Sequence, residues 1–351
     1  MPVAPAQELS AMSPPNHAPA TVAAGPPVDF RGVVFPEWAF APDGTDEADY
    51  RAACRQGYAV MARSRVAITG LARNVRAILP TTIRRLENLA CCFADHRMIV
   101  YENDSADDTR SQLLAWARTN RRVRVMCEQP GDPVNPATRC LHRAARMARY
   151  RGRCQELVLS ECSRFDAVIV VDLDIRGGWS TDGIAHTFGQ RDWDFVGANG
   201  LIYRRHGLRM NTVRQYDTWA LRFDERLVPL QPAVAGGLVY RRGAALVPVT
   251  SCFGGLGIYR MQAYAAGRYA DDDLEHATFH RSLLARGHRR LFLNPSQIVV
   301  YGRRHRFGDA TAAAALRLWA AVRGQPAPQW QCPAWAAAAT ATATPPRRAA
   351  A

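Results

Sequence analysis

Short apolar runs alternate with longer stretches of helical character between residues 65 and 173 of this chain. The runs have the length of β-strands, and the stretches between them carry apolar residues at helical spacing. This alternation predicts an α/β fold with an open, mostly parallel sheet flanked by helices. Pro80 either kinks the first helix or marks its beginning. The expected strands are 65–71, 97–101, 122–127, 165–173, 193–200, 247–260 and 291–301, and the glycines within 254–257 break the strand at 247–260. The expected helices are 75–93, 107–119, 137–162 and 271–280.

Polar residues follow three of the expected strands at the point where each strand ends. In open parallel sheets, ligands bind at the carboxyl ends of the strands, which meet at one edge. The sequence therefore predicts one cleft with three polar walls. These walls are Arg73 with Asn74, then Glu102, Asn103 and Asp104, and finally Asp172 with Asp174.

Asp172 and Asp174 stand one residue apart, directly after an apolar run. Two carboxylates at such a place repel each other, so a cationic side chain or a bound cation is expected beside them. Carboxylate oxygens suit Mg²⁺ or Mn²⁺, and such an ion would also neutralise the charge of a diphosphate. The alternative is a pair of surface carboxylates that are capped or bound by arginine.

The basic residues are all arginine, 45 of them, and the net charge is +14. The absence of lysine excludes Schiff-base chemistry and a Walker-type phosphate lysine. The excess charge suits an anionic ligand or an anionic membrane surface, although a solvated basic surface explains it equally well. No helix-turn-helix, RNA-binding or zinc-finger pattern is present, so nucleic acid is not an expected partner.

The composition predicts one large domain between two tails. Residues 1–28 are rich in proline and alanine and residues 331–351 are of low complexity, so both are expected to be disordered. The domain then covers residues 29–330. No apolar run has the length of a membrane span and no signal peptide is evident, so a cytoplasmic location is expected, with peripheral membrane contact as an option. The nine scattered cysteines suit a reducing compartment.

Five segments, taken in order, resemble glycosyltransferases of the GT-A fold. The closest resemblance is to glycosyltransferase family 69, the fungal capsule-associated α-1,3-mannosyltransferases, and its bacterial relatives. It extends over about residues 64–306. The segments are GLARNV at 70–75, VYENDSADDTR at 100–110, VVDLDI at 170–175, SCFGGLGIYR at 251–260 and LEHATFHRSLLARGH at 274–288.

The resemblance implies a nucleotide-sugar donor, with GDP-mannose favoured, and a Mn²⁺ or Mg²⁺ ion at the aspartate pair. Asp174 would contact the metal most directly, and Asp172 would lie near the ribose or the metal. His305 would complete the metal site, with His280 as the second candidate for this place. The nucleotide-binding half would be about 64–200. The residues expected to line the nucleotide are Arg73, Asn74, Glu102, Asn103 and Asp104, with Gly254 and Gly255 in a loop that approaches the ligand. For Glu102–Ser105 the alternative is a plain helix-capping loop, and for the glycines it is a strand bulge.

A second acidic cluster, residues 271–275, opens the expected helix at 271–280. Acids at a helix start also stabilise the helix dipole. The resemblance implies a carboxylate that faces the acceptor, and we expect Glu275 in this role, with Asp273 and His276 beside it. Glu275 would be the general base of an inverting enzyme. In a family that retains configuration, it would instead orient the acceptor or stabilise positive charge.

The resemblance thus implies a metal-dependent hexosyltransferase of polysaccharide biosynthesis, with a mannosyltransferase favoured. Its acceptor would be a glycan or a lipid-linked glycan, bound by the half at about 201–306. A nucleotidyltransferase is an alternative that the missing lysine disfavours. A phosphatase of the haloacid dehalogenase type is disfavoured by Arg176, which stands where threonine is expected. A non-catalytic protein binding nucleic acid or anionic membrane is a third alternative, and its affinity would fall steeply with salt.

Overall fold

The computed structural model describes residues 30–302, except residues 43–45, 136–139, 207–208, 225, 231 and 239. The predicted tails 1–28 and 331–351 lie outside the described residues, as does His305. Within the described residues, no helix combines the length and the apolarity that a membrane span requires.

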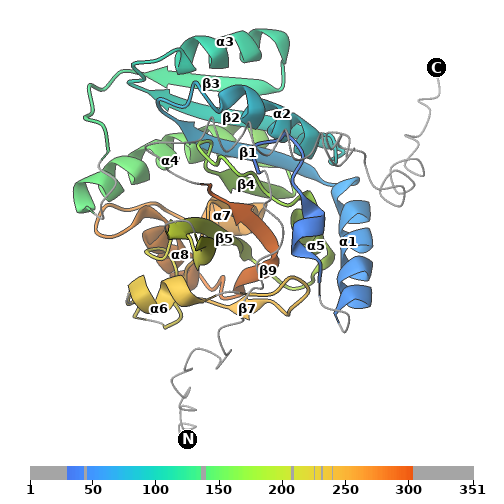
Figure 1. Cartoon of the computed structure of the whole chain (residues 1–351). Coiled ribbons are helices and arrows are strands. Elements are labelled where there is room, and N and C mark those ends of the chain that lie inside the picture. The colour runs from blue at the N-terminus through green and yellow to red at the C-terminus, as the bar shows by residue number, and fades with distance from the viewer. Residues whose placement is uncertain are drawn as a thin grey trace, which may run out of the picture.

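Nine strands form one sheet, and helices cover both of its faces (Figure 1). The strands are β1 (Arg65–Ala72), β2 (Asp95–Asn103), β3 (Val123–Glu128), β4 (Ala167–Val171), β5 (Phe195–His206), β6 (Arg209–Gln215), β7 (Val247–Pro248), β8 (Leu256–Arg260) and β9 (Leu291–Val300). The helices are η1 (Glu37–Phe40), α1 (Glu47–Met61), α2 (Leu79–Ala90), α3 (Thr109–Thr119), α4 (Leu141–Cys162), α5 (Thr181–Gly189), α6 (Pro232–Gly237), α7 (Met261–Ala266) and α8 (Glu275–Ala285).

The strand order is β3-β2-β1-β4-β8-β5-β9-β7, and β6 pairs with β5 outside this path. Strands β1 to β4 are parallel to one another, and β5 is parallel to β9. Strand β8 lies antiparallel between β4 and β5. The predicted α/β class and the mostly parallel sheet with flanking helices are therefore confirmed.

The central strand β4 is buried on both faces, because its sequence is AVIVV and all five residues are buried. Ala167, Ile169 and Val171 belong to one hydrophobic core, whereas Val168 and Val170 belong to the other. This division follows from the two-residue period of a strand. It accounts for the continuous apolar run that precedes the aspartate pair.

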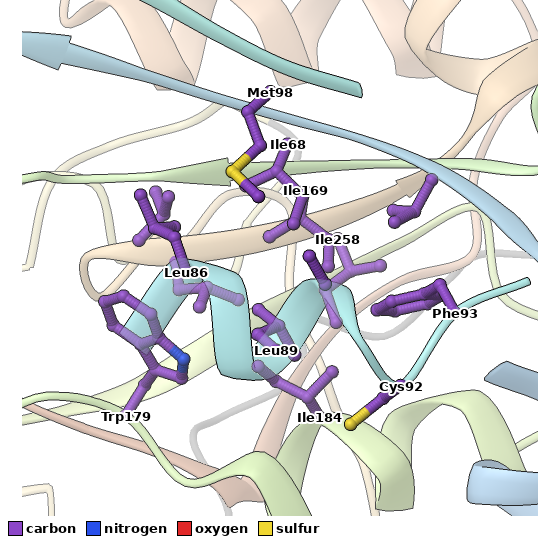
Figure 2. Close-up of a cluster of buried hydrophobic side chains, with 14 of the residues drawn as sticks. Ile68, Leu86, Leu89, Cys92, Phe93, Met98, Ile169, Trp179, Ile184 and Ile258 are labelled. Atoms are coloured by element: carbon purple, nitrogen blue, oxygen red, sulfur yellow. The ribbon is translucent and has the colours of Figure 1, made fainter. Parts of the chain in front are cut away.

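Helix α2 covers the first of these cores. Figure 2 shows its Leu86 and Leu89 packed toward Ile68, Ile169 and Ile258 of the sheet. The helix begins at Leu79, with Pro80 in its first turn, so the proline marks the beginning of the helix and does not kink it.

Helix α1 packs closely on α5 through two glycines, and this contact leads to a prediction about stability. A Cβ atom on Gly57 would lie 1.6 Å from the Ala185 carbonyl oxygen, and one on Gly189 would lie 2.0 Å from that of Ala53. We expect Gly57→Ala to lower the free energy of unfolding by about 3 kcal/mol, because the backbones of the two helices must move apart.

Urea denaturation measures this loss. Gly152 in α4 is the matched control, since a Cβ atom there would meet nothing within 4 Å. Gly152→Ala should raise the free energy of unfolding by up to about 1 kcal/mol through helix propensity alone. Equal stabilities of Gly57→Ala and the wild type would contradict the close contact of α1 and α5.

Candidate active site

The aspartate pair lies in the loop that follows β4. Leu173 and Ile175 of this loop are buried, whereas Asp172 is half-buried and Asp174 is exposed. The backbone N–H of Asp172 donates to the Gly255 carbonyl at 2.9 Å. At the carboxyl end of β4 the loop therefore exposes the carboxylate of Asp174, whereas that of Asp172 stays partly buried.

Arg151 of α4 is the cationic side chain beside this pair. Its Nη2 atom lies 2.8 Å from Oδ1 of Asp172, and its Nε atom lies 3.4 Å from Oε1 of Glu275. The Arg151 side chain is only 3% exposed. Arg151 thus links the aspartate pair to the acidic cluster at 271–275, across the edge of the sheet.

Arg151 was not among the residues that the sequence singled out. A signal for it exists, because the buried positions of α4 recur at helical spacing and Arg151 falls among them. These positions are Ala144, Ala148, Arg151, Gln155, Val158 and Cys162. A charged residue on the apolar face of a helix requires a partner in the interior.

The negative charge at this site exceeds what Arg151 neutralises. Burial raises the pKa of Asp172 to about 6, against the lowering effect of Arg151 and with a further raising effect of Asp174. The main cause is burial, which disfavours the charged form of a carboxyl group. The excess of negative charge is seen in the contacts, because the single guanidinium of Arg151 faces both Asp172 and Glu275. Oxygen ligands with unneutralised charge fit a divalent cation.

Asp217 is a further carboxylate that the sequence did not single out. It follows β6 and has a left-handed backbone, with φ of 58°. Burial, together with the charges of Asp172 and Glu275, raises its pKa to about 8, against the lowering effect of Arg143. A strained backbone and a perturbed carboxyl group are both typical of functional sites.

Tyr301 and Tyr216 border the exposed side of the pair. The Tyr301 hydroxyl donates to Oδ2 of Asp174 at 2.8 Å. The two tyrosine rings stack with their centroids 4.2 Å apart and an interplanar angle of 10°. This stack fixes the donor that orients the Asp174 carboxylate.

Glu275 and His276 open helix α8 and are both buried. Oε2 of Glu275 and both ring nitrogens of His276 have no hydrogen-bond partner among the described residues. The His276 ring stacks on Phe253 with centroids 3.7 Å apart, and burial lowers its pKa well below the usual range. The site therefore contains a carboxylate oxygen and a neutral imidazole that can still accept or donate hydrogen bonds.

Asp273 is placed differently from Glu275, although only two residues separate them. Its two carboxylate oxygens lie 2.5 and 2.9 Å from the guanidinium nitrogens of Arg222, which is buried. Oδ1 also accepts the backbone N–H of Leu274 at 2.6 Å. Both oxygens of Asp273 are therefore occupied by hydrogen bonds. Through them Asp273 stabilises the start of α8.

The polar ends of β1 and β2 lie together. The backbone N–H of Asn74 donates to Ser105 Oγ at 3.1 Å, and Asn74 Oδ1 accepts the N–H of Ala106 at 2.8 Å. Oε1 of Glu102 accepts the N–H of Ser105 at 3.0 Å, as in a capping loop. Oε2 of Glu102 is buried and has no hydrogen-bond partner among the described residues.

The loop after β3 is bound to the same edge. Asp104 accepts the backbone N–H groups of Gly131 and Asp132 at 3.0 and 3.1 Å. Arg73 donates to the carbonyls of Asp132 and Pro133 at 2.6 and 2.9 Å. Asn103 donates to Asp104 at 3.1 Å. These three polar side chains thus shape one wall of the edge by holding its loops.

Gly254 and Gly255 form a tight turn before β8, with φ of 64° and 90°. A Cβ atom on Gly254 would lie 2.3 Å from the Ala198 carbonyl oxygen. Close packing against β5 therefore accounts for Gly254. Gly255 lies beside the aspartate pair, because its carbonyl accepts the N–H of Asp172.

Among the described residues, no three His, Cys, Asp or Glu side chains are grouped to hold a metal ion. His280, a second candidate beside His305, lies in the core, where its Nδ1 and Nε2 atoms are 2.9 Å from Ser251 Oγ and 3.0 Å from Tyr259 OH.

The burial of His280 predicts a pH dependence of stability. Burial, with a smaller effect of the Arg222 charge, lowers its pKa from 6.5 to about 3. Below about pH 6.5 the unfolded chain binds a proton here that the folded protein does not, so acid lowers the free energy of unfolding. At about pH 5 this contribution is about 2 kcal/mol.

Urea denaturation at pH 7 and pH 5 checks this expectation. The loss of stability on going to pH 5 should be smaller by about 2 kcal/mol in His280→Gln than in the wild type. His142→Gln, at an exposed position, is the control and should behave as the wild type. An equal loss in His280→Gln and the wild type would show that the folded protein protonates His280 normally.

No family model and no curated protein matches this chain. Among solved structures, glucosyl-3-phosphoglycerate synthase from Mycobacterium tuberculosis, in complex with Mn²⁺, uridine diphosphate and phosphoglyceric acid, is 18% identical with a TM-score of 0.40, over 78% of this chain and 84% of that chain. A mannosyltransferase from Pyrobaculum calidifontis, in complex with GDP-Man and Mn²⁺, is 15% identical with a TM-score of 0.39, over 81% of this chain and 76% of that chain.

Proposed function

We propose that this protein is a metal-dependent glycosyltransferase that moves a hexose from a nucleoside diphosphate to a glycan or lipid-linked glycan. The observation that carries the proposal is the bridge of Arg151 between Asp172 and Glu275. It brings the aspartate pair and a carboxylate with one unbonded oxygen to the same edge of the sheet, which supports a cation site beside an acceptor site. The preference for mannose and GDP rests on the sequence resemblance alone.

The donor would bind along the carboxyl ends of β1, β2 and β4. A Mn²⁺ or Mg²⁺ ion held by Asp172 and Asp174 would neutralise the charge of the diphosphate as it leaves. Glu102 offers its buried Oε2 atom to a ribose hydroxyl or a base N–H. Asp104, Arg73 and Asn74 would keep the wall of the nucleotide site in place through their loop contacts.

Glu275 would act on the acceptor. Arg151 fixes its Oε1 atom, so Oε2 keeps a defined position at which it can accept a hydrogen bond from an acceptor hydroxyl. In an inverting reaction this oxygen takes the hydroxyl proton as a general base. In a retaining reaction it orients the hydroxyl and stabilises the positive charge of the sugar ring. His276, which is neutral, can donate or accept a further bond beside it.

Release of the nucleoside diphosphate from a panel of nucleotide sugars tests the proposal. The panel contains GDP-mannose, GDP-glucose, UDP-glucose and UDP-N-acetylglucosamine, each with Mn²⁺, with Mg²⁺ or with EDTA. We expect release from one donor with either metal and a loss of at least about 100-fold with EDTA, because the diphosphate then leaves without charge neutralisation.

A strict need for an acceptor could suppress release from every donor. Quenching of tryptophan fluorescence by GDP or UDP covers this case, and we expect quenching that requires Mn²⁺. Absence of both release and metal-dependent quenching would contradict the proposal. If the affinity for the nucleotide is independent of metal and falls steeply with added salt, the result would instead favour a basic protein that binds polyanions.

A further inference from the structure

The loop that carries the aspartate pair is held from two sides. On one side it runs along β9, where the N–H of Arg176 donates to the Tyr301 carbonyl at 3.0 Å and the N–H of Val300 donates to the Gly178 carbonyl at 2.9 Å. On the other side it meets helix α2. The hydroxyl of Thr82 in this helix donates to the Leu173 carbonyl at 3.3 Å.

Arg85, one turn after Thr82, makes the larger contact. Its Nη1 atom donates to the Ile175 carbonyl at 3.0 Å, and its Nη2 atom donates to the Arg176 carbonyl at 3.1 Å. The same guanidinium donates to the Phe30 carbonyl at 2.9 Å and to that of Gly32 at 2.6 Å. One side chain thus ties the aspartate loop to the segment that precedes η1.

The charge of Arg85 is buried without a carboxylate partner among the described residues. The residue is 5% exposed, and burial alone lowers its pKa to about 10. Burying a charge in this way costs free energy that backbone carbonyls only partly offset. An apolar side chain would fill the same space without that cost. We therefore expect the hydrogen bonds of the guanidinium to serve a function other than packing.

The loop is also shaped to accept the guanidinium. Gly178 has φ of 81°, and a Cβ atom there would lie 2.9 Å from Cζ of Arg85. On the β9 side, a Cβ atom on Gly177 would lie 2.4 Å from the Val300 carbonyl oxygen. The chain therefore passes between Arg85 and β9 with no room for side chains at these two positions.

We propose that Arg85, assisted by Thr82, is a positioning residue that fixes the backbone on both sides of Asp174 for cation binding. The carbonyls that the two residues hold belong to Leu173 and Ile175, the immediate neighbours of Asp174. The Asp174 carboxylate itself is exposed. A ligand on an unrestrained loop loses conformational freedom when it binds a metal, and a loop fixed in advance avoids this loss. The inference rests on the proposed function in taking the aspartate pair as the cation site.

The test is a titration of the purified full chain with Mn²⁺, followed by the electron paramagnetic resonance signal of free Mn²⁺. We expect Arg85→Gln to raise the dissociation constant at least about 10-fold, as loss of a residue that orients a metal ligand does. Arg85→Lys and Thr82→Val should give smaller increases. Arg84→Gln, at the exposed neighbouring position, should leave the dissociation constant unchanged.

A destabilised control separates positioning from stability. Leu113→Ala leaves a cavity at a fully buried position of helix α3, so it lowers stability and leaves Arg85 and Thr82 in place. All titrations are made where circular dichroism shows a folded protein. Arg85→Gln must bind Mn²⁺ more weakly than Leu113→Ala. If Arg85→Gln does not fold, Arg85→Lys and Thr82→Val are judged by the same comparison.

The outcomes distinguish the two proposals. Equal Mn²⁺ binding by the wild type, the Arg85 variants and Leu113→Ala overturns the positioning role and leaves the metal site standing. Failure of the wild type to bind Mn²⁺ overturns both. Weaker binding by the Arg85 variants alone supports the positioning role, whatever donor sugar the protein uses.

Discussion

Asp174→Asn should lower metal-dependent release of the nucleoside diphosphate by at least about 100-fold. The carboxylate is exposed, and the Tyr301 hydroxyl donates a hydrogen bond to it at 2.8 Å. Asparagine keeps the size of the side chain and an oxygen that accepts this bond, but it removes the negative charge that attracts a divalent ion. The variant should therefore fold as the wild type does, and its loss of activity should follow its loss of Mn²⁺ binding.

The measurement is donor turnover over a series of Mn²⁺ concentrations, together with the thermal midpoint of each protein. Tyr301→Phe is the matched control, because it removes the hydrogen bond and keeps the charge of Asp174. We expect Tyr301→Phe to lose turnover only about 10-fold or less, in line with a partner that orients a ligand. Full Mn²⁺-dependent turnover by Asp174→Asn would show that the metal binds elsewhere.

Glu275→Gln should lower kcat by about 100-fold or more and leave Mn²⁺ binding and the KM for the donor nearly unchanged. Glutamine keeps an oxygen beside Arg151 and fills the same volume, but it cannot take a proton from an acceptor hydroxyl. The effect should thus fall on the transfer step. This split between kcat and donor binding distinguishes Glu275 from Asp174.

Asp273→Asn supplies the comparison within the same acidic cluster. Asp273 is bound to the buried guanidinium of Arg222, so its replacement should lower the free energy of unfolding by about 3 kcal/mol through an uncompensated buried charge. Turnover by the folded fraction should stay close to that of the wild type. A loss of kcat in Asp273→Asn that matches the loss in Glu275→Gln would contradict the separate roles of the two residues.

Much of the fold could be predicted from the sequence because the information is local. Strand β4 is recognisable as a buried central strand, since five consecutive apolar residues supply both of its faces. The positions of Asp172 and Asp174 follow, because they stand directly after it. Pro80 left two alternatives open, and the structure decides between them by beginning α2 at Leu79.

The partners of the site residues could not be predicted, because they depend on contacts between distant segments. Arg151 of α4 contacts Asp172, which follows β4, and Glu275, which opens α8. No spacing in the sequence links these three residues. Asp273 and Glu275 look equivalent as acids at a helix start. They differ because Arg222, brought in by another loop, binds one of them.

The antiparallel strand β8 has a consequence for how the chain is made. Strand β4 pairs with β1 on one edge, and its other edge stays open until β8 is synthesised, after α5, β5, β6, α6 and β7. During translation the apolar strand β4 therefore stays unpaired on one edge until β8 has been synthesised. Pairing between strands so far apart in the sequence slows folding. A ribosome-bound or truncated chain that ends before β8 would present an unpaired apolar edge, the kind of surface on which other chains add strands and aggregate. The strands β1 to β4 consequently depend on a strand from the later part of the chain, β8, to complete their sheet.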